Sequence, residues 1–416
     1  MNATIISIGT EILLGEITDT NAVYISKMLA LYGINVYKRI TVGDNAERFK
    51  RILNMEYADC DIIITTGGLG PTADDLSKEA ACEYFDVPMI FHKDIYDDIC
   101  GYFERSGKAM SQNNKKQAYL PKDCTVMYNP NGTAPGFILE KQNKTLIMFP
   151  GPPKEMIPMF ESYAIPYFEK ISNQRVFTKN ILTYGISESE ADKKLGTITD
   201  FFPEITYATY AYTGMVRVRL GIKFDRDKHS PILEKAVEKA VELIGGKYVY
   251  STDAPDMQTA LVELLKANNI TVSTAESCTG GLISKLITDV SGASTVFECG
   301  ICSYSNRIKS GVLNVSEDIL SEYGAVSHQT AIQMAENVRN IVGSDIALSV
   351  TGLAGPQGDE RKPVGLVYIG ISSKRGTFSK EFNFCRGRIR TRDDIRILSA
   401  NAAFALAIDE IKSIKY

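Results

Sequence analysis

Two long stretches of this chain alternate short apolar runs with segments of helical periodicity, and this alternation restricts the fold more than any other feature. In the first stretch, to about residue 170, apolar runs at 4–8, 34–42 and 61–65 are each followed by a helical pattern. Such alternation indicates βαβ units and a mainly parallel sheet. Sheets of this class bind ligands beyond the carboxyl ends of their strands. The helical patterns cover residues 21–31, 47–55 and 76–85.

The same alternation returns from about residue 251 onward. A helical pattern at 257–267 precedes a β-branched run at 270–273, and runs at 364–372 and 377–384 are expected to pair as antiparallel strands. Another strand is expected at 345–350 and a closing helix at 393–411, which together predict a second α/β layer structure. The segment between the two stretches reads as a small α+β module. We therefore expect three domains, over residues 1–170, 171–250 and 251–416.

Composition places the chain among soluble globular proteins. Of its 416 residues, 23% are charged and 44% hydrophobic, and the formal net charge of -4 argues against a nucleic-acid-binding surface spread over the whole molecule. The N-terminal residues lack a basic signal region and no apolar run is long enough to cross a bilayer, so we expect a cytoplasmic protein. The 8 scattered cysteines fit reduced thiols, and we expect Cys299 and Cys302 to be structural rather than a redox or zinc pair.

Three loops rich in Gly, Asn and Pro follow apolar runs in the first domain and are expected to converge on one pocket. They cover residues 67–72, 129–136 and 150–153. Backbone amides in a glycine-rich turn can approach a phosphate closely, and Asp74 and Asp75 would suit a hydrated divalent cation that bridges a diphosphate. Adjacent aspartates before an apolar run are also common as helix caps, so the residues alone leave both interpretations open.

Around residue 277 a hydroxyl and two glycines directly follow a β-branched run. The stretch from Thr274 to Gly281 reads Thr-Ala-Glu-Ser-Cys-Thr-Gly-Gly, so Ser277 is expected where a strand turns into a helix. Such a turn exposes a side chain, and the first N–H groups of the following helix can face a developing negative charge. The same pattern also fits a plain helix cap with glycines for close packing.

A phenol and an amine follow at Tyr304 and Lys309, in a stretch without histidine. A serine must lose its proton to attack a carboxamide, and Lys309 can accept that proton only as a neutral amine, a form that burial favours. Tyr304 would then relay the proton or orient the amine. The pattern predicts a Ser/Tyr/Lys amidohydrolase in which Cys278 has no covalent role and no histidine triad operates.

A phosphate group on the substrate would need binding residues other than the catalytic ones. The loop from Thr351 to Gly358 offers backbone donors, and Arg388 and Arg392, predicted to lie one helical turn apart, could fork a phosphate. Each feature taken singly also has a structural explanation: the loop as a tight turn, and the arginines as solvated surface residues.

These motifs together resemble the C-terminal domain of the CinA (competence/damage-inducible protein A) family. The resemblance rests on residues 275–281, the Tyr304 to Lys309 spacing, residues 351–356 and the arginine pair, although Arg386-Gly387 replaces the family's usual Gly-Asp or Gly-Asn. Members with this pattern are nicotinamide mononucleotide (NMN) deamidases. The resemblance implies Ser277, Tyr304 and Lys309 as catalytic residues and backbone N–H groups near Thr279 and Gly280 as the oxyanion hole. The implied NMN-binding residues are Thr351, Gly352, Ala354, Gly355, Arg388 and Arg392.

The first domain resembles the N-terminal domain of CinA, which is similar in fold to molybdopterin-binding domains of the MoaB/MogA type. The matching stretches run from residues 8–15 and 19–21 through 41–45 to 150–156. The resemblance implies an ADP-ribose pyrophosphatase that releases AMP and ribose 5-phosphate with a divalent cation (Mg, Mn or Co) held by Asp74 and Asp75. The residues implied to bind ADP-ribose are Thr10, Glu11, Asn21, Gly67, Gly68, Gly70, Thr72 and Gly132.

The expected fold class is therefore α/β: a MoaB/MogA-like α/β sandwich, a small KH-like α+β middle domain and an α/β amidohydrolase domain. The KH-like segment contains no GXXG loop, which favours a spacer or dimerisation role. We expect a bifunctional hydrolase of pyridine-nucleotide salvage that forms a homodimer, with small-molecule substrates and no membrane or direct nucleic-acid partner. The rival hypothesis is a pterin- or nucleotide-binding accessory protein linked to competence, against which the intact Ser277, Tyr304 and Lys309 argue.

Overall fold

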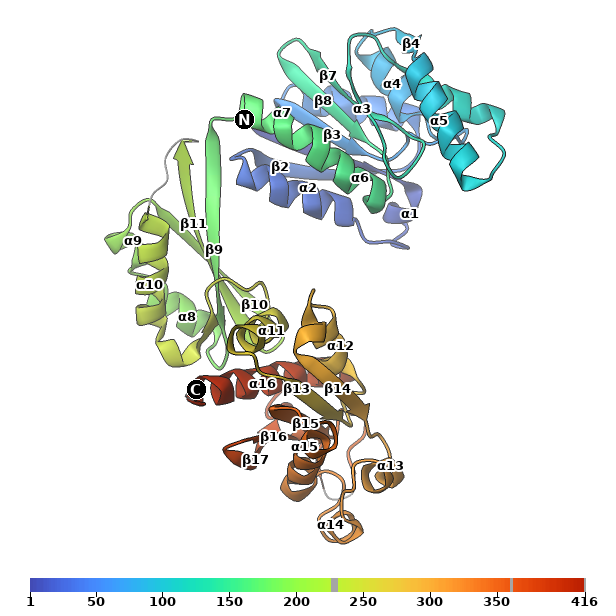
Figure 1. The fold of residues 1–416 in the computed structure, drawn as a ribbon. Helices are drawn as coiled ribbons and strands as arrows, with labels where there is room; N and C mark the ends of the chain where they lie inside the picture. The colour runs from blue at the N-terminus through green and yellow to red at the C-terminus, as the bar shows by residue number, and fades with distance from the viewer. Residues whose placement is uncertain (226–230, 360–361, 415–416) are drawn as a thin grey trace. The chain divides into compact units, whose positions relative to one another are not determined.

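A computed structural model describes residues 1–225, 231–359 and 362–414 of the chain, and Figure 1 shows its fold. The chain forms two compact units. One consists mainly of Met1–Phe177, and the other combines Thr178–Ile222 with the C-terminal residues. None of the helices in the described part of the chain combines the length and apolar character that a membrane span requires.

The N-terminal unit is built on a six-stranded sheet with the order β2-β1-β3-β8-β7-β6. The first four strands are parallel, as the βαβ alternation predicts, and β7 and β6 are added antiparallel. The strands are β1 (Asn2–Ile8), β2 (Asn35–Val42), β3 (Ile62–Thr66), β6 (Thr125–Met127), β7 (Gly136–Lys141) and β8 (Lys144–Phe149), with β4 (Met89–Phe91) and β5 (Tyr119–Pro121) paired separately.

Helices cover both faces of this sheet because successive strand residues point to opposite sides. Ile5 belongs to the core beneath α2, α6 and α7, whereas its neighbour Ile6 belongs to the core beneath α3, α4 and α5. The helices are α1 (Thr10–Leu13), α2 (Thr20–Leu31), α3 (Ala46–Tyr57), α4 (Ser77–Tyr84), α5 (Lys93–Ser106), η1 (Gln112–Ala118), α6 (Pro153–Met159), the π-helical turn η2 (Phe160–Ala164) and α7 (Ile165–Ile171).

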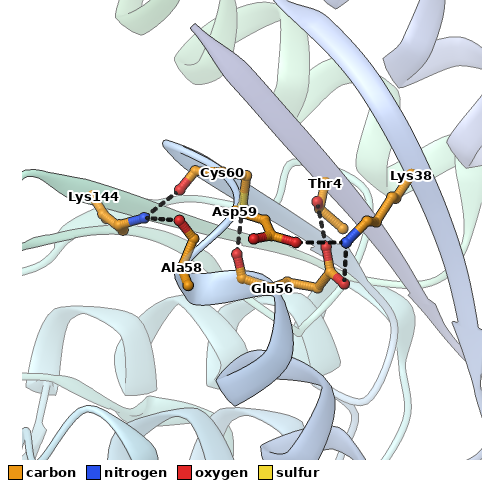
Figure 2. Close-up of polar contacts among 7 residues, drawn as sticks. All are labelled: Thr4, Lys38, Glu56, Ala58, Asp59, Cys60 and Lys144. Carbon is orange, nitrogen blue, oxygen red and sulfur yellow. Dashed lines mark hydrogen bonds and ion pairs between the residues drawn. The ribbon is translucent and has the colours of Figure 1, made fainter.

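A polar cluster joins the C-terminal end of α3 to strands β1 and β2 (Figure 2). The Glu56 carboxylate, only 2% exposed, accepts a 3.0 Å hydrogen bond from Thr4 Oγ1 and a 3.1 Å bond from Lys38 Nζ. Lys38 also reaches Asp59 at 2.9 Å, and Lys144 Nζ donates to the Cys60 carbonyl at 2.7 Å. A buried carboxylate is stable when it is paired and hydrogen-bonded, so we assign this cluster a structural role.

The middle segment forms its own sheet, with the order β10-β11-β9-β12. Its helix α10 buries Ala236, Val237 and Ala240 and contacts α8. The pairs β10–β11 and β9–β12 are antiparallel, and such pairing together with separate helices agrees with the predicted α+β module. The elements are β9 (Gln174–Thr183), α8 (Glu188–Leu195), α9 (Ile198–Phe201), β10 (Ile205–Tyr212), β11 (Met215–Asp225), α10 (Ile232–Ile244), η3 (Gly246–Tyr248) and β12 (Val249–Ser251).

The C-terminal part is a five-stranded sheet with the order β14-β13-β15-β16-β17. Strands β14, β13 and β15 are parallel, and β16 and β17 are antiparallel partners as predicted. Helices α11, α12 and α16 share one core with the sheet and α15 shares another. The elements are α11 (Met257–Asn268), β13 (Val272–Glu276), α12 (Leu282–Thr288), η4 (Ala293–Thr295), β14 (Phe297–Cys302), α13 (Asn306–Gly311), α14 (Glu317–Glu322), α15 (His328–Val342), β15 (Ile346–Gly352), β16 (Leu366–Ser373), β17 (Gly376–Asn383) and α16 (Arg392–Ser413).

Candidate active sites

Ser277 lies directly after β13, the middle one of the three parallel strands, at their carboxyl end. Its N–H donates to the Val350 carbonyl at 2.9 Å, which extends the pairing of β13 with β15 by one residue. The side chain is 9% exposed. The backbone of a central strand therefore fixes this hydroxyl, while a small part of it remains open to a ligand.

The structure brings Lys309 to Ser277, as the sequence predicts for a base and its nucleophile. Lys309 comes from α13, is 1% exposed, and places Nζ 3.0 Å from Ser277 Oγ. The amine also lies 2.7 Å from the Ser303 carbonyl and 3.4 Å from the Tyr304 carbonyl. It forms no ion pair with a described carboxylate, and burial lowers the pKa of this lysine below its ordinary value.

The contacts of Lys309 match the hydrogen-bonding capacity of a neutral amine. A neutral amine has two N–H bonds and one lone pair, and the two nearby carbonyls, of Ser303 and Tyr304, can accept both N–H groups. A protonated Lys309 donates to Ser277 Oγ, whereas the lone pair of a neutral Lys309 can accept a hydrogen bond from the Ser277 hydroxyl over the same 3.0 Å. This arrangement is the one that a general base needs in order to remove the serine proton.

The expectation that the N-terminal amides of the following helix face a developing charge is wrong for α12. The buried Glu276 carboxylate accepts hydrogen bonds from Ile283 N at 3.1 Å, Ser284 N at 2.8 Å and Ser284 Oγ at 2.6 Å. A carboxylate at a helix N-terminus satisfies these amides and interacts favourably with the helix dipole. Glu276 therefore fills the position in which the sequence pattern alone suggests an oxyanion.

The two residues predicted for the oxyanion hole behave differently. The Gly280 N–H already donates to the Ser277 carbonyl at 3.0 Å, so in this conformation Gly280 closes a tight turn instead of facing a substrate. The Thr279 N–H makes no hydrogen bond with any described residue. The Thr279 side chain is fully buried, and its Oγ1 likewise has no partner in the described part of the chain. Thr279 thus retains donor capacity and Gly280 does not.

Tyr304 turns away from the Ser277–Lys309 pair. Its side chain is 62% exposed, and its hydroxyl accepts a 2.9 Å hydrogen bond from Arg392 Nη2. The predicted relay or orienting contact would need a hydrogen bond from the phenol to Ser277 or Lys309, and the described residues make none. Only the Tyr304 backbone carbonyl touches the lysine.

The prediction that Arg388 lies one helical turn before Arg392 is wrong. The helix α16 begins at Arg392, after a capping box formed by Thr391 and Asp394, and Arg388 lies in the preceding turn. Arg388 lines a different cavity, beside Tyr184 and Gly185. A helical turn that begins at Arg392 leads to Arg396 instead.

Arg396 is a residue near Ser277 that the sequence argument missed. Its Nε and Nη2 donate to the Thr279 carbonyl at 3.2 and 2.9 Å, which links α16 to the turn after Ser277. Its i, i+4 spacing from Arg392 places both on one face of α16. The capping signal Thr391-x-x-Asp394, had it been used to place the helix start, would have shown this pairing.

One residue of the predicted loop after β15, Gly355, contacts Arg392. The Gly355 carbonyl accepts a hydrogen bond from Arg392 Nη1. The hydroxyl of Thr351 is used internally, since it donates to the Ala325 carbonyl at 2.6 Å, and Ala354 is buried. At Gly352 a Cβ would fall 2.7 Å from the Leu366 carbonyl, so glycine permits the close approach of β16. Among the predicted residues of this loop, Gly355 is thus the one that contacts the arginine face of α16, the face that carries Arg392 and Arg396.

Cys278 is a poor nucleophile in this setting. Burial raises the pKa of its thiol to about 12, so the thiolate is scarce near neutral pH. All eight cysteines have free thiols, and Cys299 and Cys302 lie on β14 as the strand assignment predicts. Serine is therefore the stronger candidate of the two adjacent nucleophiles.

A second site lies in the N-terminal unit, where the three Gly, Asn and Pro loops meet as predicted. Residues from all three loops line one cavity of about 400 Å³ at the carboxyl ends of β1, β3 and β8. Glycine is required at the closest approach: a Cβ on Gly67, whose φ is +99°, would fall 2.1 Å from the Ile8 carbonyl. Among the predicted ligand residues, Glu11, Gly67, Gly68, Gly70, Asp74 and Asp75 line this cavity.

The charge of this cavity favours a divalent cation. Five carboxylates line it and none of its lining residues is cationic, so a diphosphate would be repelled unless a cation accompanied it. Oxygen ligands suit Mg²⁺, which commonly uses one or two carboxylates and completes its shell with water and substrate phosphates. In the described residues no group of three or more His, Cys, Asp or Glu side chains is arranged so that it could hold a metal ion, so a cation here would depend on few protein ligands. The five are Glu11, Asp44, Asp74, Asp75 and Glu155.

Asp74 and Asp75 also organise the loop that carries them. Thr72 Oγ1 donates to both carboxylates, and Thr72 N donates to Asp75 Oδ2 at 3.0 Å. This hydroxyl lowers the pKa of the Asp74 carboxyl, which keeps it ionised and able to bind a cation. Thr72 is therefore a support for the two aspartates and does not itself line the cavity.

Three other predicted residues contact cavity-lining residues but do not line the cavity themselves. The Thr10 backbone N–H and hydroxyl donate to Asp44 Oδ2 at 2.9 and 2.8 Å, and Asn21 Nδ2 donates to the Gly151 carbonyl at 2.6 Å. At Gly132 a Cβ would fall 2.4 Å from Glu155 Oε2, so this glycine lets a loop pass over the carboxylate. These contacts explain the residue types at the three positions without any direct contact to a ligand.

The sequence argument did not select Asp44, Glu155 or Gln117, all of which line the cavity. Asp44 follows the carboxyl end of β2, a position that topology could have indicated. Burial raises the pKa of Glu155. Gln117 is 1% exposed, and its amide donates to the Leu69 carbonyl at 3.3 Å while its Oε1 has no described partner.

Three family models together match most of the chain. The family models described as "Probable molybdopterin binding domain", "Damage-inducible protein CinA KH domain" and "CinA C-terminal domain" match residues 4–170, 178–251 and 254–411 respectively. The succession of these three models confirms the predicted fold class.

Full-length relatives carry one common name. A competence-damage inducible protein of Thermoanaerobacter pseudethanolicus is 42% identical over 411 residues, which cover 98% of this chain and 99% of that protein. Another from Acetivibrio thermocellus is 44% identical over 406 residues, covering 96% and 97%. A solved structure of the competence/damage inducible protein CihA from Agrobacterium tumefaciens is 34% identical, covers 38% of this chain and 98% of that one, and has a TM-score of 0.35.

Proposed function

This chain belongs to the CinA family, and from that premise we propose that it is a bifunctional hydrolase of pyridine-nucleotide salvage. The C-terminal domain converts NMN to nicotinic acid mononucleotide and ammonia. The N-terminal domain hydrolyses ADP-ribose to AMP and ribose 5-phosphate with a divalent cation. The observation that carries the first activity is the buried Lys309 amine 3.0 Å from the Ser277 hydroxyl.

In the deamidase, Ser277 Oγ attacks the carboxamide carbon of NMN while its proton passes to the neutral Lys309 amine. A tetrahedral intermediate with a negative oxygen forms, and the Thr279 N–H is the donor available to it. The protonated Lys309 then returns the proton to the departing nitrogen, which leaves as ammonia, and an ester remains on Ser277. Neutral Lys309 next removes a proton from water, whose oxygen attacks the ester carbon. Lys309 then returns this proton to Ser277 Oγ as its bond to the carbonyl carbon breaks, which releases nicotinic acid mononucleotide and restores the free serine.

The arginine face of α16 supports binding of the NMN phosphate. Arg392 and Arg396 lie one turn apart on α16. The Arg392 guanidinium contacts the Tyr304 hydroxyl and the Gly355 carbonyl and forms no ion pair with a described carboxylate, whereas Arg396 lies 3.7 Å from Asp393. A guanidinium fork matches the geometry of a phosphate. Tyr304 would position Arg392 and border the substrate, in place of a proton relay.

In the N-terminal domain, Asp74 and Asp75 are the residues that would hold the cation, with substrate phosphate oxygens completing its shell. Such a cation would neutralise the diphosphate and activate a water for attack on phosphorus. Glu11, Asp44 and Glu155 line the same cavity, and the raised pKa of Glu155 makes it a candidate to move a proton from that water. A homodimer remains part of this proposal.

Purified protein should release ammonia from NMN and, in a separate reaction with Mg²⁺, Mn²⁺ or Co²⁺, release AMP from ADP-ribose. Binding of a pterin without formation of either product would contradict the proposal and favour the accessory-protein hypothesis.

Arg392→Ala should raise KM for NMN far more than it lowers kcat, because a phosphate distant from the reacting amide is bound alike in the ground and transition states. Loss of a charge-assisted hydrogen bond predicts a rise of roughly 10- to 150-fold. Steady-state ammonia release measures both constants.

Arg388→Ala is the matched control for this prediction. Arg388 lies outside the arginine face of α16, and the variant should keep KM within about twofold of wild type. Equal KM values for wild type and Arg392→Ala would remove Arg392 from the phosphate site.

Asp74→Asn should abolish most cation-dependent AMP release while NMN deamidation stays near wild type, because the two activities reside in separate domains. The metal contributes several kcal/mol, so a loss on the order of 10²-fold or more is expected. Asp74 is exposed, and its amide replacement keeps the side-chain size. Full AMP release by Asp74→Asn would exclude this residue as a ligand.

A further inference from the structure

Two successive glycines form the turn that follows Ser277. Gly280 and Gly281 both lie in the left-handed region, with φ of +59° and +89°, and no other residue type adopts this backbone as readily. Glycine also has little preference of its own for one conformation. The geometry of the turn, and with it the relative positions of the Ser277 hydroxyl and the Thr279 N–H, therefore depends on the hydrogen bonds that hold it.

One peptide group in this turn is held at both of its ends. The Gly280 N–H donates to the Ser277 carbonyl at 3.0 Å, and the Thr279 carbonyl accepts from Leu282 N at 3.2 Å. The same carbonyl accepts from two nitrogens of Arg396, Nε at 3.2 Å and Nη2 at 2.9 Å. Because the Thr279 carbonyl and the Gly280 N–H belong to one planar unit, these contacts together fix its orientation.

Arg396 donates these bonds from a rigid support. It lies near the start of α16, and its neighbour Ile395 is fully buried in the same core as Cys278 and Ile283. That core fixes the helix against the segments on both sides of the turn. At Gly280 a Cβ would fall 3.9 Å from Arg396 Nη2, so the guanidinium lies directly beside this glycine.

The contacts of Arg396 do not suit the binding of a substrate phosphate. Nε and one terminal nitrogen form an edge that can bind two oxygens of an anion, and here both nitrogens donate to a carbonyl. Nη1 lies 3.7 Å from Asp393 Oδ1, whose negative charge would repel a phosphate. The Arg392 guanidinium, in contrast, forms no ion pair with a described carboxylate.

We propose that Arg396 is a positioning residue of the deamidase, which holds the turn after Ser277 so that the nucleophile and the Thr279 N–H keep their relative positions. This inference rests on the proposed deamidase function and divides the arginine face of α16: Arg392 binds the phosphate, and Arg396 supports the turn. A displacement of about 1 Å among reacting groups can lower a rate by about 10²-fold, so loss of this support should appear in kcat.

The test compares kcat and KM of full-length variants for NMN and for nicotinamide riboside, which lacks the phosphate. Arg396→Ala should lower kcat for NMN by about 10- to 100-fold and leave KM within about threefold of wild type. The loss in kcat/KM should be the same for both substrates, because no phosphate contact is removed. Arg396→Lys, which keeps a donor for the Thr279 carbonyl, should recover part of kcat.

Lys412→Ala is the matched control. Lys412 is another cation of α16 that donates to a backbone carbonyl, that of Val249 at 3.4 Å, but it lies about 24 Å along the helix from Arg396. Its replacement should leave both constants near wild type. A rise in KM for NMN in Arg396→Ala with kcat unchanged would identify a phosphate ligand and overturn the proposal, as would wild-type values of both constants.

A reaction at Ser277 that needs no NMN separates this proposal from the proposed function. Phenylmethanesulfonyl fluoride forms an ester with an activated serine: the Ser277 oxygen bonds to sulfur, fluoride leaves, and Lys309 takes the proton. Mass spectrometry should show this reaction to be slower by about 10-fold or more in Arg396→Ala than in wild type or Lys412→Ala. In a protein that does not deamidate NMN, that difference would keep the role of Arg396 and reject only the substrate. Equal rates, including no reaction in any of the three proteins, would overturn the proposal.

Discussion

Ser277→Ala should reduce NMN deamidation to the uncatalysed background. The substitution removes the only hydroxyl within hydrogen-bond distance of Lys309 Nζ among the described residues, and with it the atom that would carry the acyl group. Ammonia release by the purified variant measures the effect. Burst kinetics, or a mass increase on wild type that corresponds to the acyl group of nicotinic acid mononucleotide with its ribose phosphate, absent from the variant, would identify the covalent intermediate directly.

Cys278→Ala is the control for the neighbouring thiol. The buried Cys278 thiol, with its pKa raised to about 12, should tolerate this change with activity within a few-fold of wild type. A Ser277→Ala protein that deamidates NMN at the wild-type rate, or a Cys278→Ala protein without activity, would contradict the proposed role of Ser277 as the nucleophile.

Lys309→Met should lower kcat for NMN by on the order of 10²- to 10⁴-fold, the usual range for loss of a positioned proton-transfer group. Methionine fills the buried position but cannot accept a proton. In wild type the rate should rise with pH as Lys309 loses its proton, because only the neutral amine can act as a base. Burial lowers this pKa, so the rise should lie at lower pH than for a solvent-exposed lysine.

Lys309→Arg separates charge from basicity. Arginine keeps a positive charge but stays protonated, so it should be as inactive as methionine if Lys309 is the base. Tyr304→Phe should cost less than either, since the phenol contacts Arg392 and not the reacting pair. A pH–rate profile that is identical in wild type and Lys309→Met would contradict the role of Lys309.

The order and type of the main elements followed from local patterns. Strands at 4–8 and 61–65 and helices at 21–31 and 257–267 reappear as β1, β3, α2 and α11 with ends shifted by at most a few residues. Periods of two and 3.6 residues are properties of short segments, so no knowledge of the partner element is needed to see them. The pairing of β16 with β17 was equally local, because a short turn joins them.

Only part of the candidate site could be predicted from local sequence patterns. Ser277 and Lys309 were selected because each carries chemistry in its own side chain. The failure at Gly280 and at the N-terminus of α12 has one cause: whether a backbone N–H is free depends on its partners in space. The Ser277 carbonyl takes the first, and the Glu276 carboxylate takes the amides of Ile283 and Ser284.

The sequence by itself determined the two α/β layer structures, the turn that bears Ser277, and the glycine-rich loops at strand ends, because hydrophobic period and glycine's backbone freedom are encoded residue by residue. Only the tertiary structure decided which arginine accompanies Arg392, since the capped start of α16 leaves Arg388 outside the helix and brings Arg396 to the Thr279 carbonyl. Likewise, only the packed interior lowers the pKa of Lys309: its burial is assembled from strands and helices distant in sequence, and desolvation acts on the sum of those neighbours.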